Sequence, residues 1–325
     1  MIRRIFLQSI LLLSFVFFAT SLLAGDAEAQ LIGSGKIDEA INQLQARVKS
    51  NPSDAESLNL LARAYYSLEQ WDSAIATNQR ALRLQPNSSD FHSWMGRAYG
   101  EKADTVGILG AASLARKTKS EFEKAVQLNP VASQARLDLA EYYIEAPGFM
   151  GGGMDKARAQ ADATARFDLA ASHLIRARMA QQHKDFDEAE LEFKAAIATA
   201  KSPASYWINL ASFYQSRSRF PEMEKAITTA VSLPSRVPSV LYDAASILNR
   251  SGRNFPGAVQ YLRDYLAEGK FDEDAPAFRA HYLMGQILER MKHRSDAIAE
   301  YRATLAMASD FKKAQSALDK LQGTA

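Results

Sequence analysis

The glycine-rich segment EAPGFMGGGMDKA, residues 145–157, is the stretch whose composition comes nearest to a phosphate-binding loop. A nucleoside triphosphate loop needs Gly, four residues, and then Gly-Lys with Ser or Thr, so that backbone amides surround the phosphates and the lysine reaches them. No Gly-Lys follows these glycines. A dinucleotide fingerprint needs a preceding strand, and LAEYYIEAP in front of this segment is predicted to be helical. We therefore predict no nucleotide site here.

Metal binding and catalysis are not indicated either. The chain has no cysteine, and its five histidines show no pair at a metal-ligand spacing. His92 and His281 are predicted to pack in the fold or to line a groove. A Gly-x-Ser-x-Gly nucleophile turn is absent, and the paired acids Asp187 and Glu188 fit the start of a helix. We predict a protein that is not an enzyme and has no cofactor and no metal.

The chain carries an internal repeat of 34 residues, the distance from Pro52 to Pro86. Within it, Leu58, Leu61, Ala62 and Tyr65 share one helix face, and after a turn Ala74, Asn78 and Ala81 share the face of a second helix. The order large, small and aromatic recurs along the chain, for example at Met95, Gly96 and Tyr99, at Leu139, Ala140 and Tyr143, and at Leu210, Ala211 and Tyr214.

This pattern resembles the tetratricopeptide repeat, a hairpin of two antiparallel helices. The resemblance implies an all-α fold, an α-solenoid in which hairpins stack as a superhelix, because a single hairpin cannot bury its own apolar face. It also implies a concave groove that is presented to a protein or peptide partner. The repeat residues do not identify that partner.

The solenoid is predicted to fill residues 30–325. It opens on a half-repeat at residues 35–52, whose first helix would fall in the N-terminal segment. About seven hairpins follow over residues 53–308. A capping helix at residues 310–321, with Asp310 as its N-cap and a charged outer face, is predicted to end the array in solvent.

Helix residues beside the packing stripe are predicted to face the groove. Arg63 and Arg97 occupy equivalent places 34 residues apart, so we expect them to stack, with Asn59 and Tyr66 beside Arg63. Such a pair suits a partner's carboxylates. The alternative is that these arginines are ordinary surface residues, or that Glu141 in the next repeat neutralises them.

Two repeats are longer than the rest. Pro86 and Pro130 are 44 residues apart, which is 10 more than the period, and EAPGFMGGG adds 5 residues to the following hairpin. Because insertions of neighbouring repeats map to one face, they predict an exposed apolar cluster that could bind a partner. Alternatively, the insertions pack on each other, or the second helix extends over residues 108–128. The cluster comprises Val106, Ile108, Leu109, Phe149 and Met150.

The N-terminus has the layout of a secretory signal peptide, with Arg3 and Arg4, an apolar run and the small-x-small triplet Ala27-Glu28-Ala29. We predict that residues 1–29 are removed and that the chain is exported, to the periplasm or beyond. The alternative is an uncleaved inner-membrane anchor at residues 5–24, which are long enough to cross a bilayer. A membrane partner is expected only in that case.

Lys and Arg number 39 and Asp and Glu 37, and the net charge of +2 gives no field suited to nucleic acid. These features together predict a non-enzymatic scaffold of the bacterial envelope that binds a protein or peptide. Two alternatives stay open. One is a membrane-anchored envelope assembly factor, and the other, from a different class, is a small-ligand binder or hydrolase that uses the groove.

Overall fold

The structure of the chain is a computed structural model that describes residues 27–323, except for the side chains of residues 108 and 109. The predicted anchor at residues 5–24 lies outside the described residues, as does the predicted signal peptide except for residues 27–29. Those three begin a short helical segment, residues 27–33, which leads into the array. Its Glu28 is buried, and both carboxylate oxygens accept hydrogen bonds from Arg47.

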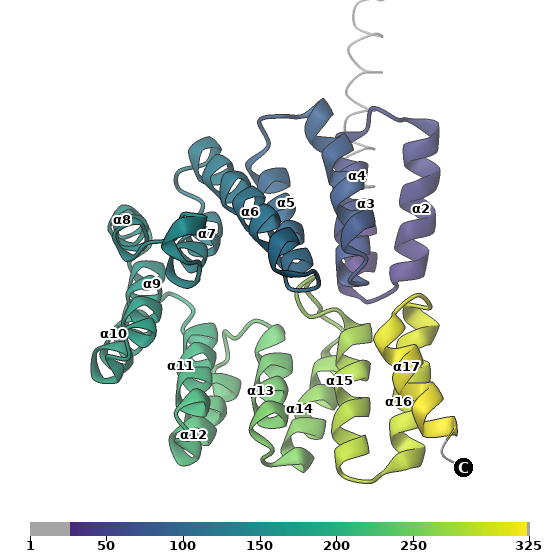
Figure 1. The fold of residues 1–325 in the computed structure, drawn as a ribbon. Coiled ribbons are helices and arrows are strands. Elements are labelled where there is room, and N and C mark those ends of the chain that lie inside the picture. Colours follow the sequence, from purple (N-terminus) through teal and green to yellow (C-terminus); the bar gives the residue numbers. More distant parts are fainter. Residues whose placement is uncertain (1–26, 324–325) are drawn as a thin grey trace, which may run out of the picture.

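The described chain is all-helical, and the predicted α-solenoid is confirmed (Figure 1). Helix α2 (Ile37–Ser50) precedes the array and α17 (Lys312–Gly323) follows it. Between them lie seven antiparallel pairs: α3 (Ala55–Ser67) and α4 (Trp71–Leu84), α5 (Ser89–Ala103) and α6 (Ile108–Leu128), α7 (Ser133–Glu145) and α8 (Met154–Thr164), α9 (Leu169–Gln182) and α10 (Phe186–Thr199), α11 (Ala204–Ser216) and α12 (Phe220–Ser232), α13 (Ser239–Ser251) and α14 (Phe255–Glu268), and α15 (Ala277–Arg290) and α16 (Arg294–Met307).

Close approach of the two helices of a pair depends on the small residue of the repeat. A Cβ atom added to Gly96 on α5 would lie 2.4 Å from the ring of Phe122 on α6, and one added to Gly285 on α15 would lie 2.6 Å from the ring of Tyr301 on α16. The missing side chain therefore makes room for an aromatic ring of the partner helix. This is the packing that the small positions of the sequence repeat predict.

The two insertions have different structures. Ten extra residues lengthen α6, which runs over Ile108–Leu128, so the alternative of an extended second helix applies to this repeat. The glycine-rich segment forms an enlarged turn that contains the 3-10 helix η1 (Gly148–Met150). In this turn Gly151 has a φ of +94°, and a Cβ on Gly152 would lie 1.8 Å from the carbonyl oxygen of Ala146. Only glycine fits these two positions.

The array curves back on itself, so that α15 to α17 lie against α2 and α3 (Figure 1). Ile32, Ile37 and Leu61 from the N-terminal side form one buried cluster with Phe278 and Phe311 from the C-terminal side. The two phenylalanine rings meet edge to face, with centroids 5.2 Å apart. We call this cluster the seam. It joins residues that are more than 200 positions apart in sequence.

Polar contacts border the seam. Arg279 donates a hydrogen bond to the carbonyl oxygen of Ser67 at 2.9 Å, and the Lys313 ammonium lies 2.8 Å from the Glu69 carboxylate. The amide of Ser309 donates to Asp38 at 2.9 Å. These bonds satisfy backbone groups at helix ends that would otherwise face water or the opposite half of the molecule.

The prediction of a solvent-facing C-terminal cap was wrong. Helix α17 begins at Lys312, and Asp310 is exposed in the turn before it rather than at its N-cap. Phe311 precedes the helix and is buried in the seam. The sequence showed a charged helix at the end of the array but not the distant helices that cover the residue in front of it.

Three hairpins share a histidine–glutamate contact. In each, Nδ1 of a histidine on the first helix approaches a glutamate on the second: His92 and Glu121 at 2.5 Å, His173 and Glu192 at 2.5 Å, and His281 and Glu300 at 2.7 Å. Burial alone would lower the pKa of His92, but hydrogen bonds to Glu121 and to the carbonyl of Pro86 outweigh it, so that this pKa lies above its ordinary value.

This raised pKa predicts a pH dependence of stability. The stabilisation from charged His92 is complete below the ordinary histidine pKa of about 6.5 and is lost as the pH rises through the raised value of the folded state. Urea unfolding at several pH values should therefore show a larger loss of unfolding free energy for His92→Gln at about pH 6 than at about pH 9. The exposed His183 provides the control variant, His183→Gln. An equal loss at both pH values would contradict the prediction.

The seam predicts that both ends of the array unfold together. Phe311→Ala should lower the free energy of unfolding by about 3–5 kcal/mol, the usual cost of truncating a buried phenylalanine. Hydrogen exchange should also show faster exchange of amides in α2, because α2 and Phe311 share one core. Phe149→Ala serves as the control, since this ring is 83% exposed. If α2 exchange is unchanged in Phe311→Ala, the ends are not coupled.

Candidate binding site

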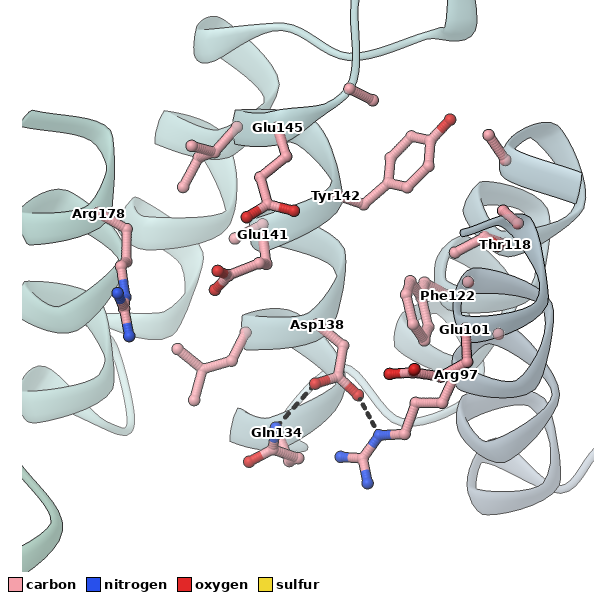
Figure 2. A pocket seen from close by; sticks show the side chains of 18 of the residues that line it. Arg97, Glu101, Thr118, Phe122, Gln134, Asp138, Glu141, Tyr142, Glu145 and Arg178 are labelled. Atoms are coloured by element: carbon pink, nitrogen blue, oxygen red, sulfur yellow. Dashed lines mark hydrogen bonds and ion pairs between the residues drawn. The ribbon is translucent and has the colours of Figure 1, made fainter. Parts of the chain in front are cut away.

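A pocket of about 660 Å³ opens on the concave side of the array. Helices α5, α6, α7 and α9 provide most of its walls (Figure 2). Its floor is apolar, made by Phe122, Leu137, Ile144, Leu174 and Ile175. Charged side chains surround this floor, namely Arg97, Glu101, Asp104, Asp138, Glu141, Glu145 and Arg178. An apolar surface with a few polar groups around it is the usual form of a binding pocket.

Helix periodicity explains why the charged residues converge. On α7, Asp138, Glu141 and Glu145 are spaced by 3 and 4 residues, so they form one stripe, and Figure 2 shows them on the pocket side of the helix. The opposite stripe of α7 holds Leu139 and Tyr143, which are buried. Packing of that apolar stripe therefore fixes the direction of the acidic one.

The cations and anions of the pocket do not balance. Arg97 donates from Nε to Asp138 at 2.9 Å, so these two neutralise each other. Arg178 donates a hydrogen bond to the side chain of Asn209 at 2.9 Å. In the described part of the chain, no cation forms an ion pair with the four other carboxylates, those of Glu101, Asp104, Glu141 and Glu145.

Two of these carboxyls have perturbed acidity. Burial raises the pKa of Glu145, and the charge of Glu141 adds to the effect. Burial likewise raises the pKa of Glu101, with a further contribution from Asp104. Both shifts have the sign expected when carboxylates share a partly desolvated space without a counter-ion. The pocket therefore carries an excess of negative charge.

The predicted arginine pair is present beside this pocket. The guanidinium carbons of Arg63 and Arg97 each lie 5.0 Å from the ring centroid of Trp94, and Tyr66 meets the same ring edge to face at 5.4 Å. The 34-residue spacing thus brings the two arginines onto one aromatic side chain. The sequence analysis did not single out Trp94.

Both arginines already bind carboxylates of the chain itself. Nε and Nη2 of Arg63 donate to the two carboxylate oxygens of Glu273 at 2.7 and 2.5 Å, and Nη1 of Arg97 lies 3.9 Å from Asp274. The two acids belong to the loop of residues 269–276, which connects α14 to α15. The partners that neutralise the pair are therefore Asp138 and this loop rather than Glu141.

Asn59 does not face the groove, which corrects its placement in the sequence analysis. Its side chain is 1% exposed, and its amide donates to Asn78 at 3.0 Å, while the Asn78 amide donates to the carbonyl of Phe91. The helix offset that predicted exposure points instead into the interface between the repeats. Tyr66, by contrast, does line the pocket.

The predicted apolar cluster is only partly described. Phe149 is 83% exposed, whereas Met150 lines the pocket and its carbonyl oxygen accepts a hydrogen bond from Tyr142 at 2.8 Å. Ile108 and Leu109 begin α6, and their side chains lie outside the described part, so their share in a cluster stays a prediction.

Comparisons with known proteins agree with this architecture. Residues 30–89 match the family model of the tetratricopeptide repeat. A probable UDP-N-acetylglucosamine–peptide N-acetylglucosaminyltransferase, SEC of Arabidopsis thaliana, is 34% identical over 76 residues, 23% of this chain and 8% of that protein. Cellulose synthase operon protein C of Escherichia coli K12 is 38% identical over 63 residues, 19% of this chain and 5% of that protein. The chain thus spans less than a tenth of these curated relatives.

Among solved structures, the crystal structure of yeast Tom70 is similar with a TM-score of 0.50 and 13% identity, over 89% of this chain and 78% of that chain. At this identity the similarity concerns the fold alone. Together with the hairpins, it defines the class as an α-solenoid of helix pairs. The family match and the recurring repeat residues then identify the chain as a tetratricopeptide repeat protein. Such repeats generally mediate contacts between proteins.

The contact of Arg63 with Glu273 predicts a structural role for this arginine. Arg63→Ala should lower the free energy of unfolding by about 3 kcal/mol, because it leaves a buried carboxylate without its partner. Replacing both residues, as in Arg63→Met with Glu273→Met, should restore much of the loss. Urea unfolding of the single and double variants measures this coupling.

Arg253 provides the matched control, since its ion pair with Glu224 is exposed. Arg253→Ala should cost less than about 1 kcal/mol. If Arg63→Ala costs no more than this control, then Arg63 is not needed for the fold and stays free to serve a partner.

Proposed function

We propose that this protein is a non-enzymatic scaffold that holds a segment of a protein partner inside the curve of its array. The observation that supports this proposal is the pocket of about 660 Å³ on the concave side, with an apolar floor built by adjacent repeats. Repeat arrays use such concave surfaces for recognition, because the stacked helices hold side chains from several repeats in fixed positions. A peptide segment fits the pocket better than a folded domain, since the ends of the array meet at the seam.

The chemistry of the pocket fits binding rather than catalysis. Its titratable residues are carboxylates and arginines, and the three histidines that contact glutamates form their bonds within hairpins. A general base needs a nucleophile or a substrate proton within hydrogen-bond reach. Within residues 27–323, no group of three or more residues is arranged to hold a metal ion.

Export to the bacterial envelope is part of the proposal and rests on the N-terminal sequence. In the described chain no helix has both the length and the apolar character needed to span a bilayer. Removal of residues 1–29 would delete Glu28 and with it the ion pair to Arg47, which measures 2.9 Å. The intact mass of the chain from its native cell distinguishes a processed form from a membrane-anchored one.

Pocket variants test the scaffold function. Leu137→Gln with Leu174→Gln should reduce the amount of cross-linked partner recovered from native cells by about tenfold, because central apolar contacts dominate interface energies. Quantitative mass spectrometry of the cross-linked material measures this. Leu191→Gln is the control, since Leu191 is an exposed leucine on α10 outside the pocket. Equal recovery from the pocket variant and the control would show that partners bind elsewhere.

A further inference from the structure

We propose that the segment held in the pocket presents a lysine or arginine side chain to Glu101, Glu141 and Glu145. This inference rests on the proposed function and adds the chemistry of the partner. It starts from the geometry of the walls: Glu141 and Glu145 extend from α7, and Glu101 faces them from α5 (Figure 2). A side chain that enters the pocket therefore passes between carboxylates on both sides.

The cations of the chain are not available to these carboxylates. Arg97 is bound to Asp138, Arg63 to Glu273, and Arg178 to Asn209. Asp104 adds a fourth acid to the same wall as Glu101. A cationic side chain is thus the group that would relieve the repulsion among the carboxylates, and a partner with acidic residues would increase it.

The floor of the pocket suits the rest of such a side chain. Lysine and arginine carry aliphatic stems that pack on apolar surface while the charged end stays among polar groups. Phe122, Leu137 and Leu174 supply that surface between the acidic walls. An apolar residue next to the cation in the partner would cover the remainder of the floor. The occupant is therefore a short segment with a basic residue flanked by apolar ones.

The sequence analysis had suggested the opposite charge for the partner, because it identified the arginine pair and not its occupants. The loop of residues 269–276 explains the difference. It supplies Glu273 and Asp274 to Arg63 and Arg97 from more than 170 residues away in the chain. With the arginines neutralised by the chain itself, the charge that remains on the concave side is negative.

A selection from a random library of displayed 12-residue peptides tests the inference. The probe is the library itself, and the full chain is the immobilised target. Peptides enriched on the wild type should contain lysine and arginine about twofold more often than the unselected library, and acidic residues less often. Binding of the best basic peptide, followed by fluorescence anisotropy, should weaken as salt is added.

The variant that removes the proposed contacts is Glu101→Gln with Glu141→Gln and Glu145→Gln. It should bind the best basic peptide about tenfold more weakly than the wild type, since each partly exposed contact contributes a fraction of a kcal/mol. A matched control changes three exposed acids that do not line the pocket, in the variant Asp155→Asn, Asp187→Asn and Glu188→Gln. This control should bind like the wild type.

The outcomes separate the two proposals. Enrichment of acidic or uncharged peptides that the pocket variant Leu137→Gln with Leu174→Gln no longer binds would overturn the basic-partner inference and leave the scaffold function standing. Equal binding by the triple variant and the control would also overturn the inference. A library that shows no enrichment over a surface without protein would argue against peptide binding itself, and so against the proposed function.

Discussion

The seam between the two ends of the array is the interaction on which the rest of the structure depends. In an open solenoid each repeat contacts only its neighbours, and stability is close to a sum of local contributions. Here Phe278 and Phe311 are buried together with Ile32 and Ile37, so the last helices share a core with the first. A Cβ on Gly35 would lie only 2.6 Å from the backbone nitrogen of Phe278, which shows how closely the two ends approach. The array therefore becomes one closed unit, and its concave side becomes an interior.

Closure also decides the electrostatics of that interior. The loop of residues 269–276 reaches the arginines of the first repeats only because the ends meet, and Glu273 then binds Arg63 through two hydrogen bonds. The chain as a whole carries a formal charge of +2, yet the pocket has more free carboxylates than cations. Net charge and local charge thus differ in sign, because folding pairs some charges and leaves others unpaired. The partner responds to the second quantity.

The fold could be predicted from the sequence because the information is local and repeated. Each 34-residue unit contains its small residue, its aromatic residue and its turn, and Gly96 and Gly285 contact rings of their own hairpins. The histidine–glutamate contacts had a similar signal that was missed. His173 and His281 each lie 19 residues before their glutamates, and His92 lies 29 residues before Glu121, a difference equal to the 10-residue insertion. The acidic stripe could also have been found, since Glu145 follows Glu141 by one helical turn.

The seam and the occupants of the arginine pair could not be predicted in this way. They depend on the curvature of the whole array, to which every hairpin makes a small contribution that no local pattern reveals. Asn59 shows the same limit on a smaller scale, since a shift of one position on a helix separates a groove residue from one inside the interface, and its partner Asn78 lies on the next helix. Residues that contact neighbours in sequence were placed well, and residues whose partners come from distant repeats were not.

The two irregular repeats are adjacent to the pocket, and this connects the departures from the period with the site. The enlarged turn after α7 contributes Pro147 and Met150 to the pocket wall, and Tyr142 holds the turn through its bond to the Met150 carbonyl. The lengthened α6 contributes Thr118 and Phe122. In the regular repeats, tight turns and helices of similar length let neighbouring hairpins pack closely. Where a turn is enlarged and a helix is extended, the hairpins cannot close the same space, and a pocket with an apolar floor remains between them. The glycine-rich segment that cannot bind a phosphate thus shapes the place where we expect a partner to bind.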